Sequence, residues 1–474
     1  MNKISKLISV LLVMLLLVFT FYGSGREMKT QTETSAGVSW LNRSNNLTIW
    51  YTDERLSAYI SKAAVEFGER EDVTVIPVLK PADSFIEGCY AASVEGESYP
   101  DVIITGSETL EKAYYSGMAC EIPDEDMQIG PLNFSDAAVN AVTYKGMKLG
   151  YPLSFDTCVL VYNRTYLEQW ASQMAIADLT GNAIDMEGGS SETEDTGETG
   201  LTVDDIDPAE LEALTSEYIQ KMVPYTLEDL LTIANSYSVP DGVEGILSWD
   251  MSSIMYNYWL VGGAFTVGGE CGDDRHNISI NNDTAAECLT KYQNLHDYFS
   301  IESDEVTYDS VIQQFIDGKT VFTIGGYDLV STLKEASDDG SFAYEYGFSE
   351  MPNVTSDIRS RSLAITSVVC INSYSAKKDL AERFALCLTR EETDVFSDLT
   401  GMACCARTFG WDGGANQIYA LEYADSVSLP KMMETENYWM QIEAMFARIW
   451  EGGDIDDELE MLEDSLNSVM NNSV

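Results

Sequence analysis

Apolar runs and helical patterns alternate along the chain from residue 47 onwards. Short apolar runs occur at Leu47–Trp50, Val73–Pro77 and Pro100–Ile104. Between them, Leu56–Arg70 and Phe85–Val94 carry apolar residues at helical spacing. Short apolar runs are typical of buried strands, and a period of about 3.6 residues is typical of helices. The order strand, helix, strand, helix, strand therefore predicts an α/β fold, with a parallel sheet covered by helices.

This sheet also predicts where a ligand would bind. In open α/β sheets, ligands bind in the crevice beyond the carboxyl ends of the strands. The loops at these ends are Tyr51–Glu54, after the first strand, and Thr105–Glu108, after the third. We therefore expect binding residues in both loops.

Further elements are predicted towards the C-terminus. Strand-like runs occur at Met147–Pro152, Cys158–Tyr162 and Ser362–Asn372. Helical patterns occur at Ala285–Phe299 and Asp454–Met470. The second half of the chain therefore continues the α/β pattern.

The N-terminus has the features of an export signal. Lys3 and Lys6 precede an apolar run of sixteen residues, Leu7–Tyr22, which is followed by small residues. This run is short for a membrane span of about twenty residues. We predict that residues 1–26 form a signal peptide or an uncleaved anchor. The polar residues 27–46 are predicted to be a linker.

An acidic segment at 180–215 interrupts the pattern. No Lys or Arg occurs between Arg164 and Lys221. Its first part is too polar to bury a core, and it is predicted to be a partly disordered surface loop without calcium-loop spacing. Asp207 followed by Pro208 is a helix-start pattern, because Asp caps a helix and Pro fits its first turn.

The overall charge excludes one class of partner. The 474 residues include 78 acidic and 27 basic side chains, for a net charge of −51. A chain this acidic repels a phosphate backbone, so we expect no nucleic-acid partner. With 45% hydrophobic residues, the chain can still bury large cores.

Metal and catalytic patterns are scarce. Nine Cys and two His occur without a CxxC pair, so no metal and no cofactor is predicted. Adjacent Cys404 and Cys405 could form a vicinal disulfide or remain buried thiols. Gly318–Thr320 reads Gly-Lys-Thr, but Gln313 stands where a phosphate loop needs glycine. No GxSxG or HExxH pattern occurs, and the chain is predicted not to be an enzyme.

The order of five segments carries a family resemblance. They are LTIWYTDE (Leu47–Glu54), Tyr99–Ile122, Ala141–Asn163, FIDGKTVFTIGGYD (Phe315–Asp328) and NYWMQIEAMFARIWEGG (Asn437–Gly453). In this order the chain resembles extracellular solute-binding proteins of the ABC sugar-uptake type, similar to the maltose-binding protein. The resemblance covers nearly all of Leu47–Leu466, apart from an insertion at Glu168–Val223.

The resemblance implies a two-lobed periplasmic-binding-protein fold of type II. Each lobe would be a mainly parallel sheet flanked by helices, and several strands would form the hinge. Lobe 1 would comprise residues 47–154 and 362–405, and lobe 2 would comprise residues 157–360 and 408–474. The implied protein is an exported monomer that delivers its ligand to a membrane permease. Many relatives carry a lipid-anchor Cys after the leader, whereas the first Cys here is Cys89.

The resemblance also implies a binding site between the lobes. The implied ligand-binding residues are Thr52, Glu54, Ser107 and Glu108 from lobe 1, Asp156 from the crossing loop, and Trp249, Asp250, Tyr256, Tyr327, Asp328 and Trp439 from lobe 2. Arg407 and Trp411 are weaker candidates. Trp50 and Trp450 are predicted to lie in the core instead.

Three hypotheses remain for the function. A mono- or oligosaccharide fits a site of aromatic rings and planar polar groups. The carboxylates of Glu54, Glu108, Asp156 and Asp250 would equally serve a cationic solute such as a polyamine. An extracellular glycosidase would need two of these carboxylates at a catalytic separation. The strand end Ile103–Gly106 lacks the aromatic residue of maltodextrin binders, which argues against a maltodextrin ligand.

Overall fold

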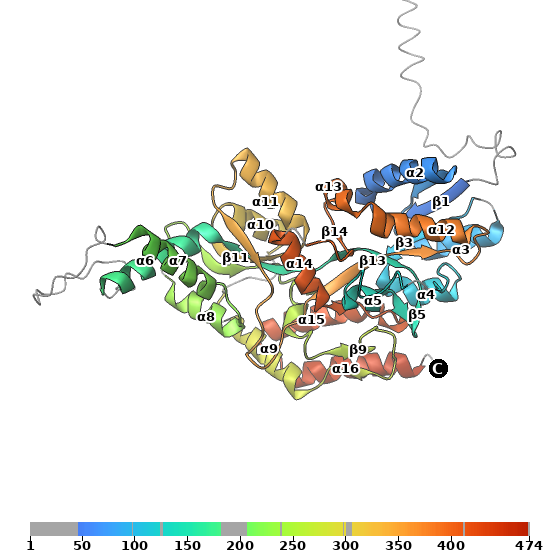
Figure 1. Ribbon diagram of the computed structural model, residues 1–474. Helices are drawn as coiled ribbons and strands as arrows, with labels where there is room; N and C mark the ends of the chain where they lie inside the picture. The colour runs from blue at the N-terminus through green and yellow to red at the C-terminus, as the bar shows by residue number, and fades with distance from the viewer. Residues whose placement is uncertain are drawn as a thin grey trace, which may run out of the picture. The chain divides into compact units, whose positions relative to one another are not determined.

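The computed structural model describes residues 46–472, apart from 97, 124–126, 182–205, 238, 297, 300–305 and 411–412 (Figure 1). The predicted signal peptide, almost all of the predicted linker and the first part of the acidic insertion lie outside the described residues. Within the described ranges, no helix has both the length and the apolar character needed to cross a membrane.

The first of two main sheets has seven strands in the order β14-β6-β13-β3-β1-β2, with β15 paired to β13. The strands are β1 (Asn46–Tyr51), β2 (Thr74–Leu79), β3 (Val102–Gly106), β6 (Tyr151–Asp156), β13 (Leu363–Ile371), β14 (Ala403–Cys404) and β15 (Val427–Ser428). The three predicted N-terminal strands are therefore confirmed as β1, β2 and β3.

This sheet is mixed, whereas a mainly parallel sheet was expected. β1 and β3 are parallel, with Ile49 opposite Val102. β13 runs antiparallel to both β3 and β6. The difference arises because β13 enters this sheet after a long excursion of the chain and inserts between strands that precede it. β15 belongs to this sheet although residues 408–474 were assigned to the second lobe.

The second sheet has four strands in the order β12-β7-β11-β8. They are β7 (Val159–Asn163), β8 (Gly245–Ser248), β11 (Thr320–Gly325) and β12 (Tyr346–Ser349). β11 is antiparallel to β7 and parallel to β8. Only Thr157 and Cys158 separate β6 of the first sheet from β7 of the second.

Helices accompany both sheets (Figure 1). In the part of the chain that builds the first sheet they are α2 (Ser57–Glu71), α3 (Phe85–Glu95), α4 (Leu110–Tyr115), α5 (Asp136–Val142), α12 (Lys378–Leu386) and α13 (Phe396–Thr400). The others are α6 (Arg164–Thr180), α7 (Pro208–Met222), α8 (Leu227–Ser236), α9 (Asp283–Leu295), α10 (Tyr308–Ile316), α11 (Asp328–Asp339), α14 (Gly414–Ala424), α15 (Tyr438–Trp450) and α16 (Ile455–Asn472). Helix α7 starts as predicted, because the Asp207 side chain accepts a hydrogen bond from the Ala209 N–H.

Trp50 and Trp450 lie in the core as predicted, and the cysteines are not paired. Trp50 and Trp450 are both buried in hydrophobic cores. All nine cysteines are free thiols, so Cys404 and Cys405 are not joined. Adjacent residues of a strand point to opposite faces. Accordingly, Cys404 lies in the core under the first sheet, and Cys405 lies in a separate apolar cluster.

One buried carboxyl group forms hydrogen bonds with the segment that connects β12 to β13. Glu422 of α14 accepts hydrogen bonds from the Ser362 hydroxyl at 2.5 Å and from the Met351 N–H at 2.9 Å. Burial raises the pKa of Glu422 to about 7, although these hydrogen bonds oppose the shift. The folded protein therefore favours the protonated acid.

We predict that Glu422→Gln removes a pH dependence of stability. A raised folded-state pKa gives stability that is present below the unfolded value and lost as the pH rises through about 7. Glutamine can accept from Met351 and donate to Ser362 without a charge. At pH 8 the variant should be more stable by up to about 3 kcal/mol, since one pKa unit corresponds to about 1.4 kcal/mol.

The measurement is urea denaturation of both proteins at pH 5 and pH 8. Glu460→Gln, on the exposed face of α16, is the matched control and should change neither value. An equal loss of stability by Glu422→Gln at both pH values would contradict the prediction.

Candidate functional site

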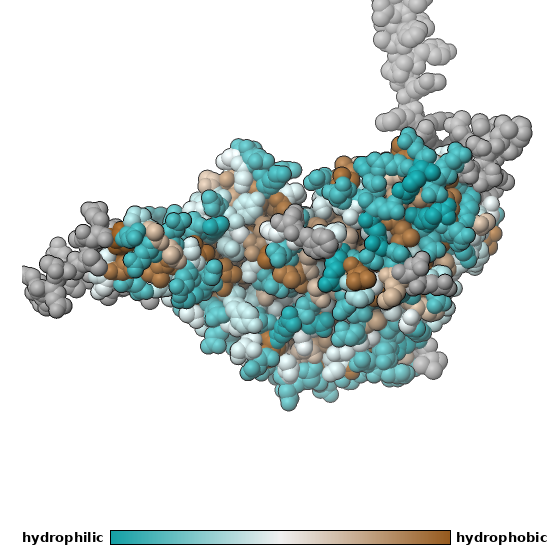
Figure 2. All heavy atoms as spheres, viewed as in Figure 1, coloured by the Kyte–Doolittle hydropathy of each residue, from teal (hydrophilic) through white to brown (hydrophobic). Residues whose placement is uncertain are grey.

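The strand registers bring loops from both sheets to one place. In the first sheet, Gly106 at the end of β3 pairs with Ser367, and Asp156 at the end of β6 pairs with Ile365. In the second sheet, Gly325 at the end of β11 pairs with Val159. Because β6 continues almost directly into β7, these two edges face each other. In Figure 2 the surface is hollowed between the parts covered by α11 and α13.

Two carboxylates meet at this place above a glycine. A Cβ atom added to Gly326 would lie 2.9 Å from Asp328 Oδ1 and 3.3 Å from Asp156 Oδ1. Asp156 Oδ1 also accepts a hydrogen bond from the Tyr327 N–H at 3.3 Å. The absence of a side chain at Gly326 therefore gives the two carboxylates their space.

Both carboxyl groups resist ionisation. Burial is the main cause that raises the pKa of Asp156 to about 6, and the neighbouring charge of Asp328 adds to it. Burial likewise raises the pKa of Asp328. Both side chains are nevertheless exposed to solvent. An accessible carboxylate that lacks full solvation gains by binding a donor or a cation.

Tyr308 fixes one of these carboxylates and was not predicted. Its hydroxyl donates to Asp328 Oδ1 at 3.0 Å and accepts from the Gly326 N–H at 3.2 Å. Its ring stacks on Tyr256 with centroids 4.9 Å apart and planes 4° apart. Thr307 and Ser310 form a capping box that begins α10 at Tyr308. That helix-start pattern was the available sequence signal, but it did not indicate the partner.

Arg55 supplies positive charge to the group. It lies in the short helix η1 (Glu54–Leu56), after β1, and forms a salt bridge of 2.6 Å with Asp53. The hydrogen bond with Asp53 is the main cause that raises the pKa of Arg55, and the charges of Asp156 and Asp328 act in the same direction. Three carboxylates and one guanidinium thus leave the group with an excess of negative charge.

Unpartnered polar atoms lie at the end of β3. Ser107 and Glu108 belong to the short helix η2 (Ser107–Thr109). Ser107 Oγ and Glu108 Oε2 are buried and have no hydrogen-bond partner among the described residues. Burial raises the pKa of Glu108, while the charge of Lys431 lowers it. Since buried polar atoms are normally satisfied, these two are available to a ligand or to water.

The structure brings several predicted residues together. Asp156, Tyr256, Tyr327 and Asp328 lie in one group, although Tyr327 contributes its N–H and turns its hydroxyl to Asn416 Oδ1 at 2.7 Å. At the end of β1, Thr52 is half-buried and Glu54 is exposed.

Three other predicted residues do not join this group. Trp249 is only 1% exposed and packs edge-on against Phe299 and Trp450 in the core. Asp250 is buried and accepts hydrogen bonds from the N–H and hydroxyl of Ser252. Trp439 is half-buried on α15 against other aromatic rings. Of the two predicted tryptophans, Trp249 therefore lies in the core and Trp439 packs beside other rings.

Neither of the two weaker candidates, Arg407 and Trp411, is seen beside the carboxylate pair in the described part of the chain. Arg407 donates to the Pro131 carbonyl at 2.7 Å, away from the carboxylate pair. Trp411 lies outside the described residues. Among the residues with described positions, no cluster of His, Cys, Asp and Glu is suited to holding a metal ion.

Comparison with known proteins identifies the family and the fold. The family model described as bacterial extracellular solute-binding protein matches residues 62–401. A search of the curated proteins found no match. Several solved structures are similar over nearly the whole of both chains.

One is the extracellular solute-binding protein of Staphylococcus aureus in complex with maltose, at 17% identity and a TM-score of 0.68, covering 91% of this chain and 99% of that one. Another is a cyclo/maltodextrin-binding protein complexed with maltotetraose, at 17% identity and a TM-score of 0.66, covering 90% and 97%. The maltose-binding periplasmic protein of Listeria monocytogenes, with maltose, has 16% identity and a TM-score of 0.65, covering 91% and 100%. These likenesses confirm the predicted two-lobed α/β fold of type II.

We predict that Asp328→Asn lowers the pKa of Asp156. The variant removes a negative charge beside Asp156 but leaves the burial that causes most of the shift. The pKa should therefore fall from about 6 while remaining above its ordinary value. Carbon-13 NMR titration of the Asp156 carboxyl measures it. Asp338→Asn, at the exposed end of α11, is the control, and an Asp156 pKa that Asp328→Asn leaves unmoved would show that the carboxylates are not coupled.

Proposed function

We propose that this chain, which belongs to the bacterial extracellular solute-binding protein family, binds a carbohydrate between its two lobes for import by an ABC transporter. The protein is exported and acts at the outer face of the cell membrane or in secreted form. It hands the sugar to a membrane permease and catalyses no reaction. The proposed lobes are 47–154 with 362–405, and 157–360 with 408–474, except that β15 pairs with the sheet of the first lobe.

The carboxylate pair above Gly326 is the observation that supports a sugar most directly. Asp156 and Asp328 can each accept hydrogen bonds from sugar hydroxyls, and such bonds to charged acceptors are strong. The half-buried Tyr256–Tyr308 stack offers an aromatic surface for the C–H groups of a sugar ring. Three relatives with the same fold were solved with maltose or maltotetraose, which supports the same ligand class.

The aromatic residues support a short saccharide. A maltodextrin chain needs several platforms in a row, but Trp249 belongs to the core and Trp439 packs against neighbouring rings. The strand end at Ile103–Gly106 supplies no ring either. One or two sugar rings would be enough to span the carboxylate pair and the neighbourhood of Arg55.

Binding would be coupled to closure of the lobes. Asp53 and Arg55 follow β1 of the first sheet, whereas Asp328 follows β11 of the second. A ligand that contacts both sides gains its full set of contacts only when the lobes are closed. Its binding therefore favours the closed state by that difference. The permease would recognise the closed form.

Asp156→Asn should weaken sugar binding roughly ten- to a hundredfold, since a hydrogen bond to a charged group contributes about 1.5–3 kcal/mol. Isothermal titration of the chain from Glu27 with a panel of neutral sugars and polyamines measures this, with Asp338→Asn as the control. Product analysis on the same oligosaccharides tests for turnover. Sugar binding that Asp156→Asn leaves unchanged, or shortened products at more than trace rates, would count against the proposal.

A cationic solute is the second candidate, and the charge of the site favours it. Asp53, Asp156 and Asp328 outnumber Arg55, which is already held by Asp53. An ammonium group placed between Asp156 and Asp328 would relieve the repulsion between them. The stacked tyrosines could contribute cation–π attraction.

The pH dependence of binding separates the two candidates. Below its pKa of about 6, Asp156 becomes neutral, whereas an amine remains charged. Affinity for an amine should therefore fall on the order of tenfold between about pH 7.5 and pH 5. The affinity for a neutral sugar should fall much less, because a protonated carboxyl can still donate and accept hydrogen bonds. Titrations at both pH values decide between a charge-driven and a hydrogen-bonded ligand.

A further inference from the structure

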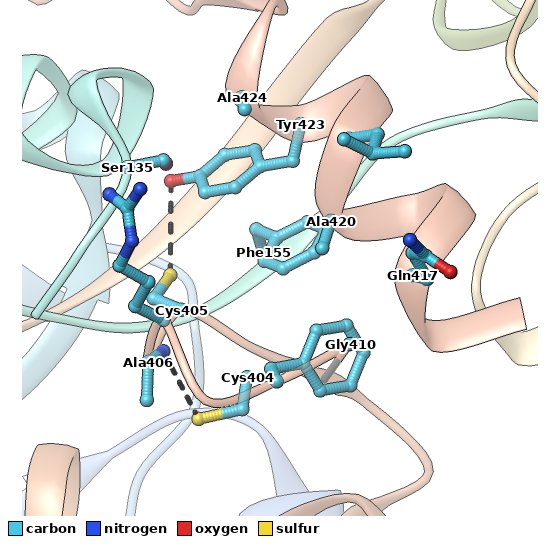
Figure 3. Close-up of a pocket in the computed structure, with 13 residues that line it drawn as sticks. Ser135, Phe155, Cys404, Cys405, Ala406, Gly410, Gln417, Ala420, Tyr423 and Ala424 are labelled. Carbon is cyan, nitrogen blue, oxygen red and sulfur yellow. Dashed lines mark hydrogen bonds between the residues drawn. The ribbon is translucent and has the colours of Figure 1, made fainter. Parts of the chain in front are cut away.

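A separate cavity lies between the β6–β14 edge of the first sheet and helix α14 (Figure 3). Its volume is about 270 Å³. Its lining is largely apolar and includes Phe155, Phe409, Ala420 and Tyr423, together with Arg407 and Gln417. Neither Asp156 nor Asp328 contributes to it.

Aromatic rings form a fixed wall of this cavity. Phe155 and Tyr423 stack with centroids 4.0 Å apart and planes 4° apart. Phe409 stands edge-on to Phe155 at 5.8 Å. The Tyr423 hydroxyl is held by Thr366 at 2.8 Å, and the Cys405 thiol is 3.8 Å from it. Because these polar groups already have hydrogen-bond partners within the wall, the space beside the rings favours an apolar ligand.

The lining also includes charged and polar groups that reach solvent. Arg407 and Gln417 are both exposed. Arg407 uses one N–H to bind the Pro131 carbonyl. A guanidinium has five N–H donors and keeps its charge at all ordinary pH values. It can therefore also bind a carboxylate, in the paired geometry that suits these two groups.

We infer that this cavity is a second binding site, for a small aromatic carboxylate. The ring would lie against Phe155 and Tyr423, and its carboxylate would meet Arg407. An apolar cavity of about 150 Å³ in another protein is known to bind benzene, so the volume here is sufficient for one substituted ring. This site does not require the proposed sugar site.

Titration of benzoate into the full chain tests the inference, with benzyl alcohol as the neutral analogue. We expect saturable binding of one benzoate, weakened about tenfold by Arg407→Gln, whereas binding of benzyl alcohol should be unaffected by this change. Arg164→Gln, which removes an exposed arginine on α6, is the matched control and should leave both affinities unchanged.

A variant that fills the cavity tests whether the ligand binds there. Ala420→Phe places a ring in the cavity and should abolish binding of both probes, with thermal unfolding used to confirm that it folds. If it does not fold, the Arg407→Gln comparison still tests the inference. Absence of saturable benzoate binding, or binding that Arg407→Gln does not weaken, would overturn it. Benzoate that binds equally well to folded Ala420→Phe would show that it occupies another place.

Discussion

The hydrogen-bond ladders of β13 determine how the two halves of the molecule meet. This strand pairs with β3 on one side and with β6 on the other. A strand in the middle of a sheet must satisfy its N–H and C=O groups on both sides, which fixes its register strongly. Ser367 thereby places the end of β3, and Ile365 places Asp156 at the end of β6. A strand that arrives late in the sequence therefore positions residues from two earlier segments.

The carboxyl groups at this junction are crowded by protein although both side chains are exposed, and the crowding has a cost that the local structure partly offsets. Backbone hydrogen bonds from Tyr327 and Thr157 lower the pKa of Asp156, and the Tyr308 hydroxyl with the backbone of Asp328 and Leu329 lowers the pKa of Asp328. The effect of burial is larger, so both pKa values remain raised. A ligand that brings further hydrogen-bond donors therefore gains from binding here, because it stabilises the charged carboxylates. The same residues would be poor choices if they served stability alone.

Much of the fold could be predicted from the sequence, but the composition of the site could be predicted only in part. Periodicity and length identified β1 to β3, α2 and α3, because local patterns determine these elements. Asp328 entered the prediction through the family resemblance of Phe315–Asp328, the segment that contains β11. Trp249 was expected in the site but its side chain lies in the core, because its direction depends on Phe299 and Trp450, which lie far away in the sequence. Tyr308 was missed for the same reason, since only the fold brings α10 to Gly326.

One strand lies between the two places where this protein offers unusual chemistry. Phe155 and Asp156 are neighbours on β6, and alternation along a strand sends their side chains to opposite faces. Asp156 faces the carboxylate pair, while Phe155 forms a wall of the aromatic cavity. Phe409 connects the same regions, because its ring contacts both Phe155 and Tyr327. If the lobes move about this strand and each ligand binds the open and closed states with different affinity, occupancy of one site changes the affinity of the other by a reciprocal factor. The shared strand, rather than any long-range path, would carry that coupling.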